Sequence, residues 1–253
     1  MRWARDEADL VRLQVALAEL ATKEPQWQSR DKAPVIGGVF AATRTRHPKG
    51  GAEGEDVWSA AVVMRAGRVL DHAVVRGRAG APYRPGFLAL VWGPLLEETV
   101  QALSRPPDVL LLDATGRDHP RRGGLALHLG AVLNVPTIGV TDRTLVAVAE
   151  DPEPDRGDAC PFLIDGRVVG HVVRTRARVR PVCVHAGWRT DPDQARALVL
   201  AVTGARSRTP EPLRRARHLV RTRRAIDEGR SPSGGSTEGE LTGIRFGSAG
   251  PPR

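Results

Sequence analysis

The sequence predicts an α/β protein in which a mixed β-sheet is flanked by helices. Short apolar runs typical of buried strands alternate with segments whose apolar residues recur every three or four positions, as in amphipathic helices. The 253 residues, 41% of them hydrophobic and 26% charged, are enough for a substantial core. The apolar runs are much shorter than the roughly 20 residues of a membrane span.

The N-terminal half predicts two helices and three strands. The strand run APVIGGVFAA is rich in valine and glycine, and the next two strands form a hairpin that turns at Gly67. Proline-rich segments mark the corner before the second helix and the end of that helix. In chain order we expect a helix over Glu7–Ala21, strands over 33–42, Val57–Met64 and Arg68–Val75, and a helix over Phe87–Leu103.

The C-terminal half predicts a central strand, DVLLLD, a second hairpin turning at Asp165 and Gly166, and two further strands. We expect residues 1–230 to form one domain and the glycine-, serine- and proline-rich residues 231–253 to be a disordered tail. In chain order the expected elements are a strand over 108–113, a helix over His119–Leu133, a strand over 135–142, a hairpin over 160–175, a strand over 179–187, and helices over Pro192–Thr203 and Pro210–Asp227.

The formal net charge of +9 favours a polyanionic partner, with nucleic acid the first to consider. The last predicted helix contributes much of this charge; a solvated surface helix is the alternative interpretation. Its arginines are Arg214, Arg215, Arg217, Arg221, Arg223 and Arg224. The N-terminus lacks the apolar core of a secretion signal, so we expect a cytoplasmic protein in which Cys160 and Cys183 are reduced.

Asp113, at the end of the central strand, is the first candidate for catalysis, because a strand end holds a carboxylate rigidly at the edge of a sheet. Asp118 follows; it is either the N-cap of the next helix or an acid of the same site as Asp113. His119, Arg121 and Arg122 at the start of that predicted helix are suited to hold a phosphate.

A second acidic pair opens the helix at Pro192. Asp191 reads as its N-cap, which leaves Asp193 free to point toward the same cleft as Asp113. Two carboxylates can bind magnesium, although magnesium usually requires further oxygen ligands. Tyr83, the only tyrosine, stands between Pro82 and Pro85 and is suited to wedge between bases or, alternatively, to pack over the hairpin.

Three motifs resemble the Endonuclease V family: PYRPGFL, then LLLDATGRDHPRRGGLALHLG followed by VPTIGV, and HAGWRTDPDQARAL. The resemblance covers most of residues 5–215. It implies a ribonuclease H-like fold that binds deaminated bases such as inosine in DNA or RNA. Active members of the family cut the strand with the help of magnesium.

The resemblance also implies roles for individual residues. Tyr83 matches the strand-separating wedge, flanked by Pro82 and Arg84. Asp113 and Asp193 match catalytic, metal-binding aspartates, and His119 matches the histidine of the HPRR segment. Gly116 lies in the segment that lines the base pocket, near the basic pair Arg121 and Arg122.

Several positions depart from the family pattern. Val39 and Trp92 stand where the family has metal-binding acids, Asp142 replaces a lysine, and Trp188 replaces a histidine. We therefore expect a nucleic-acid-binding family member whose catalysis is lost or strongly reduced. The alternatives are an active magnesium-dependent endonuclease, in which Asp113, Asp193 and a substituted acid such as Asp118 or Asp142 rebuild the site, and a scaffold that binds a small molecule or a protein partner.

Overall fold

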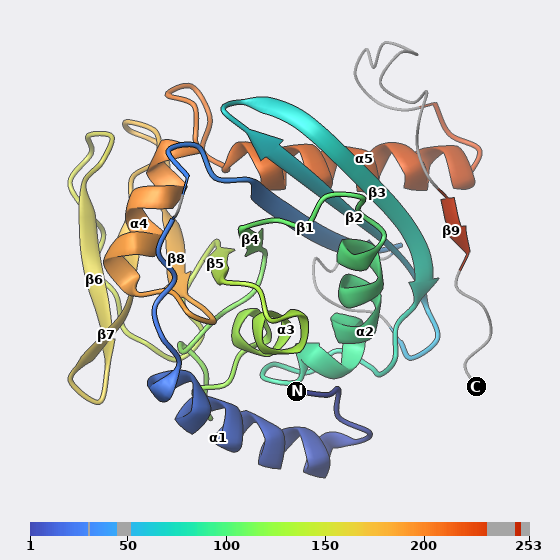
Figure 1. Ribbon diagram of the computed structural model, residues 1–253, viewed down its shortest axis with the longest axis horizontal. Coiled ribbons are helices and arrows are strands. Elements are labelled where there is room, and N and C mark those ends of the chain that lie inside the picture. Colours follow the sequence, from blue (N-terminus) through green and yellow to red (C-terminus); the bar gives the residue numbers. More distant parts are fainter. Residues whose placement is uncertain (30, 45–51, 232–245, 249–253) are drawn as a thin grey trace.

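The computed structural model describes residues 1–29, 31–44, 52–231 and 246–248, and its centre is one nine-stranded mixed sheet (Figure 1). The strand order is β6-β7-β8-β5-β4-β1-β2-β3-β9. The predicted mixed sheet with flanking helices is confirmed. None of the helices in these residues is long and apolar enough to span a membrane.

Apart from β9, which falls in the predicted tail, the observed elements follow the predicted order. The strands are β1 (Ile36–Thr43), β2 (Asp56–Arg65), β3 (Arg68–Arg78), β4 (Val109–Leu112), β5 (Thr137–Thr141), β6 (Ala159–Ile164), β7 (Arg167–Val173), β8 (Val182–Ala186) and β9 (Phe246–Ser248). The helices are α1 (Glu7–Lys23), α2 (Leu88–Gln101), α3 (Leu125–Leu133), α4 (Pro192–Ala201) and α5 (Glu211–Asp227).

Helices cover both faces of the sheet. On one face, α2 and α3 pack over β1 to β5, and α1 lies outside α3. On the other face, α4 covers β7 and β8, while α5 lies along β1 and β2 (Figure 1). The apolar side of α5 faces inward, because Leu213, Ala216 and Val220 are all buried against the strands.

Strand direction determines which loops meet at each edge of the sheet. The strands β1, β4 and β5 are parallel, whereas β8 runs antiparallel to β5, with Ala186 opposite Ile138. Asp113 therefore follows β4 at the edge where β1 and β5 end. The loop that follows β8 lies at the opposite edge, where β5 begins.

The third helix is shorter than predicted. It begins at Leu125, with Gly124 as its N-cap, so residues 119–124 are turns and Asp118 is not a helix cap. Close backbone approach explains the difference. A Cβ on Gly124 would lie 2.3 Å from the Thr115 carbonyl oxygen, so the chain folds back on itself before the helix starts.

Three residues of the predicted disordered tail, Phe246–Ser248, form β9 and pair in parallel with β3. The other residues of the tail after 231 lie outside the described residues, as do residues 45–51 of the loop before β2. Both cysteines are free thiols.

Candidate nucleic-acid and active site

The carboxylate of Asp113 faces the guanidinium of Arg217. Asp113 is at the end of β4, and Arg217 reaches it from the second turn of α5, with Nη2 3.7 Å from Oδ2. The same guanidinium lies over the ring of Phe40 on β1, 4.8 Å from the ring centre. The positively charged group beside this candidate catalytic acid is therefore a side chain of the protein itself.

Asp193 does not share a site with Asp113. Its Oδ1 lies 3.6 Å from Nε2 of His171 on β7, and its side chain is 80% exposed. Three strand spacings separate β7 from β4, which is about 14 Å at roughly 4.8 Å per strand. Two oxygens that ligate one magnesium at about 2.1 Å are at most about 4 Å apart. The structure does not bring the two predicted ligands together.

Val39 and Trp92 are core residues. They are 1% and 3% exposed, respectively, and belong to one cluster of buried apolar side chains that also contains Leu112. Neither side chain offers an oxygen to a cation. Within the described ranges, no group of three or more histidine, cysteine, aspartate or glutamate side chains could hold a metal ion.

The family resemblance implies a magnesium site at the sheet edge around Asp113. Magnesium prefers six oxygen ligands in octahedral geometry, bound through one or more carboxylates. At this edge Asp113 faces Arg217, and Asp142, which follows β5 and lines the same hollow, pairs with Arg208. The residues present at this edge do not match the oxygen-rich ligand set that magnesium requires.

His119 forms hydrogen bonds that connect its own turn to the loop that precedes α2. Its Nδ1 accepts the backbone N–H of Arg121 at 3.2 Å, and its Nε2 lies 3.1 Å from the carbonyl oxygen of Gly86. The imidazole is 2% exposed, and this burial lowers its pKa to about 4. At neutral pH it is therefore an uncharged donor that fixes the loop, and it contributes no positive charge to a phosphate site.

Arg121 contacts the same loop and also helix α1. Its Nε donates to Oε1 of Gln14 at 2.6 Å, its Nη2 donates to Gly86, and its guanidinium stacks on Phe87, 4.8 Å from the ring centre. The guanidinium of Arg84 also lies over the Phe87 ring, 5.2 Å from its centre, and pairs with Glu7 at 2.6 Å. These two arginines brace the loop around Tyr83.

Tyr83 lines a small cavity next to His119 and Gly86. The cavity has a volume of about 50 Å³, and Tyr83 is half-buried in its wall, whereas Pro82 and Arg84 are exposed. Polar and apolar groups both face it, from α1, the segment after β4 and the loop at Leu145. Its lining includes Gln14, Tyr83, Gly86, Thr115, His119 and Leu145. The wedge candidate and His119 therefore belong to one site.

Asp118 has a role that local sequence rules missed. It is fully buried, and its carboxylate accepts the backbone N–H groups of Leu145, Val146 and Ala147 at 2.6–2.9 Å. Its Oδ2 also lies 3.8 Å from Nδ1 of His185. The oxygens of Asp118 hold a loop that lines the Tyr83 cavity. Asp142 pairs with Arg208 at 2.7 Å, so both acids proposed to rebuild a metal site have other partners.

Arg122 and Gly116 have structural roles at the edge of this site. Arg122 adopts a left-handed φ of 59° and directs Nη2 to Oδ2 of Asp165 at 2.8 Å, in the β6–β7 turn. Gly116 passes so close to β8 that a Cβ would lie 2.1 Å from the carbonyl oxygen of Ala186. Only glycine fits there without a backbone shift.

Comparison with known proteins agrees with this architecture. The family model described as Endonuclease V matches residues 17–218. An Endonuclease V from Methanopyrus kandleri is 39% identical over 235 residues, which cover 92% of this chain and 95% of that protein. The crystal structure of the Streptomyces avermitilis Endonuclease V is 36% identical with a TM-score of 0.76, and the match covers 90% of this chain and 96% of that one.

A more distant structure shows the same fold. The Endonuclease V of Ciona intestinalis, solved with a 24mer DNA containing an inosine followed by a ribo-adenosine, is 22% identical with a TM-score of 0.68. The match covers 88% of this chain and 99% of that one. The protein therefore has the ribonuclease H-like nuclease fold that its sequence motifs imply. It belongs to the Endonuclease V family.

Proposed function

We propose that this protein is a divergent Endonuclease V family member that binds DNA or RNA, including strands with deaminated bases such as inosine, and has lost or strongly reduced hydrolysis. Family membership and the net charge of +9 support binding to a polyanion. The proposed loss of hydrolysis rests on the residues at the sheet edge around Asp113.

One observation supports the proposal that catalysis is reduced. Asp113, the one family-type acid left at this edge, faces Arg217 at 3.7 Å, while the positions expected to supply further acids are the buried Val39 and Trp92. A metal-dependent nuclease uses its cation to activate water and to neutralise charge on the phosphate. A guanidinium can neutralise charge, but it does not lower the pKa of a bound water as a metal does.

The Tyr83 cavity supports a role in base recognition. An aromatic ring beside a small cavity can stack on or displace a base, and base–aromatic stacking contributes about 1–3 kcal/mol. The volume of about 50 Å³ is well below the roughly 300 Å³ of small-ligand pockets. A base therefore enters only when the wall opens, and one part of that wall is the loop at Leu145, which Asp118 holds.

The test is a paired binding and nicking assay. Inosine-containing and matched inosine-free single and double strands are incubated with the full chain in magnesium, in manganese and in EDTA. We expect salt-dependent binding in all three conditions and no metal-dependent product. The Streptomyces avermitilis relative is assayed in parallel as the comparison protein.

Two results would contradict the proposal in different ways. Metal-dependent product that Asp113→Ala abolishes would establish an active endonuclease. Failure of the full chain to bind any of these strands at low salt would favour the third interpretation, a scaffold used for a small molecule or a protein partner.

A further inference from the structure

An arginine-lined concavity lies along α5, beside the edge that carries Asp113. Its volume is about 340 Å³, within the range of small-ligand sites of roughly 300–1,000 Å³. Every side chain in its lining has a hydrogen-bond donor, and three of them are guanidinium groups. The lining consists of Thr209, Arg214, Arg217, His218, Arg221 and Thr222.

The helix period explains why these side chains converge. Arg214, Arg217, His218 and Arg221 occupy positions i, i+3, i+4 and i+7 of α5, which form a single stripe on a helix. From Arg214 to Arg221 the stripe extends for about 10.5 Å along the helix axis, at 1.5 Å per residue. A stripe of this length can contact more than one phosphate of an extended strand.

Arg217 links this concavity to Asp113. Arg217 and Thr209 also line a narrower hollow of about 20 Å³ whose walls include Asp113 and Arg208. Stacking on Phe40 fixes the guanidinium between the two spaces. Its Nε is buried and has no hydrogen-bond partner among the residues that the structure describes, so this group retains donor capacity.

We propose that the α5 stripe is a phosphate-binding groove for the nucleic-acid backbone, in which Arg217 provides the positive charge next to Asp113 and no divalent cation is needed. This inference rests on the proposed function and adds the surface and the chemistry of contact. Guanidinium groups suit it because they bind phosphate oxygens in a bidentate manner and keep their charge at all physiological pH values.

In such a groove, Asp113 affects the affinity for nucleic acid in the opposite direction from a metal ligand. In a metal site, removal of the carboxylate weakens cation and substrate binding. In an arginine groove the carboxylate competes with phosphate for Arg217 and repels the backbone, so its removal strengthens binding. The two mechanisms predict opposite effects of one substitution.

The experiment measures binding of a fluorescent single-stranded oligonucleotide to the full chain in EDTA over a series of salt concentrations. We expect Arg217→Gln and Arg221→Gln each to weaken binding by about tenfold and to lower the salt slope by about 0.7, the value for one lost phosphate contact on a single strand. Asp113→Asn is expected to tighten binding by about threefold or more.

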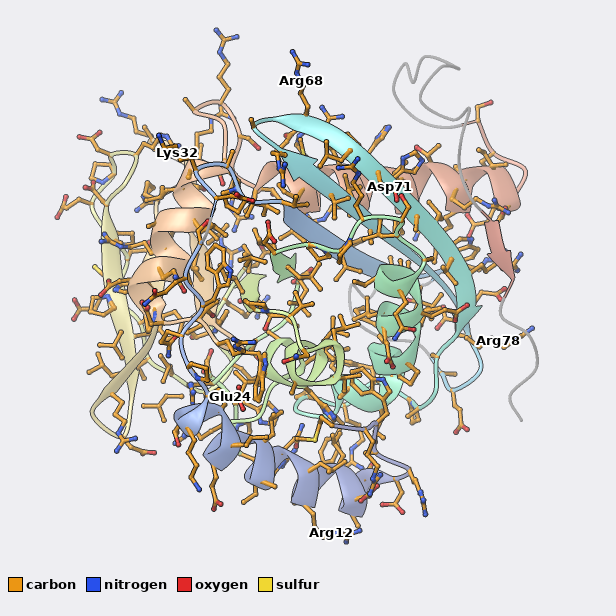
Figure 2. All side chains as sticks on the ribbon, viewed as in Figure 1. Arg12, Glu24, Lys32, Arg68, Asp71 and Arg78 are labelled. Atoms are coloured by element: carbon orange, nitrogen blue, oxygen red, sulfur yellow. The ribbon has the colours of Figure 1, made fainter. Side chains whose placement is uncertain are left out.

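Arg68→Gln is the matched control. Arg68 is an exposed arginine that begins β3, a strand parallel to β4, so it lies at the opposite sheet edge from Asp113, and Figure 2 shows its side chain projecting outward. We expect this variant to bind like the unchanged protein. Because Arg217 is partly buried, thermal melts verify that each variant is folded, and the exposed Arg221 tests the groove independently.

The outcomes separate this inference from the function on which it rests. If the unchanged protein binds but Arg217→Gln and Arg221→Gln behave like Arg68→Gln, the groove is wrong and the proposed function stands. If binding disappears in EDTA, or if Asp113→Asn weakens it, the cation-free mechanism is wrong. If the unchanged protein binds no oligonucleotide at low salt, the proposed function fails as well.

Discussion

His119 and the carbonyl oxygen of Gly86 are joined by a hydrogen bond of 3.1 Å from the imidazole Nε2. This bond connects the turn after β4 to the loop that carries Tyr83, two segments far apart in the sequence. Because Nδ1 already accepts the N–H of Arg121, the bond requires the neutral imidazole with its proton on Nε2. The shape of the Tyr83 cavity therefore depends on the protonation state of a buried histidine.

Acid should weaken the fold through this histidine. Burial lowers the pKa of His119 from 6.5 to about 4, so between these values the unfolded chain binds a proton that the folded chain does not. We expect the free energy of unfolding to fall as the pH drops from about 6.5 toward 4, by up to about 3 kcal/mol from this residue. Urea unfolding across this range measures the effect.

His119→Gln isolates this contribution, because it removes the titrating group. His128 and His171, whose pKa values burial also lowers, remain in both proteins. We expect the variant to lose part of the pH dependence. An unchanged slope in the variant would show that His119 is not the residue responsible.

Asp118→Asn should destabilise the protein by about 2–4 kcal/mol. The carboxylate is fully buried and accepts three backbone N–H groups, whereas an asparagine replaces one of its two oxygens by an amino group that faces a backbone donor with donors of its own. Asp193→Asn, at a side chain that is 80% exposed, should change stability by less than about 0.5 kcal/mol. Equal denaturation midpoints for the two variants would contradict the loop-holding role of Asp118.

Gly116→Ala should cost about 2–4 kcal/mol in thermal or urea unfolding. The added Cβ would lie 2.1 Å from the Ala186 carbonyl oxygen, and this backbone atom cannot move without disturbing β8. Gly204→Ala provides the control, because a Cβ there meets nothing within 4 Å. If both variants are equally stable, the close approach between the segment after β4 and β8 is not required.

Tyr83→Ala should weaken binding to nucleic acid about 5- to 150-fold, the equivalent of 1–3 kcal/mol of stacking, with little loss of stability. Tyr83→Phe retains the ring and should bind like the unchanged protein. Anisotropy titrations of both variants, with single-stranded and fully paired oligonucleotides, provide the comparison. Equal affinities for Tyr83→Ala and Tyr83→Phe would exclude ring stacking as the contribution of this residue.

The sequence was sufficient for most of the elements and for the family, although it did not predict β9 and placed the start of α3 too early. The period of apolar residues located α1 and α5, and the turns at Gly67 and Gly166 located both hairpins, because these signals are local. The motifs around Tyr83 and Asp113 identified the Endonuclease V family. The replacements at Val39 and Trp92 were also visible in the sequence, because they are questions of residue type.

The partners of the charged residues were decided by tertiary structure. Asp193 lies beside His171 on β7, and β8 and β5 separate β7 from β4, an arrangement of strands that no local pattern contains. Asp118 binds a loop 27 to 29 residues away instead of capping a helix. Arg217 reaches Asp113 because α5 crosses the sheet beside β4. Long-range packing selects which charges meet, since electrostatic partners depend on distance in space and not on separation along the chain.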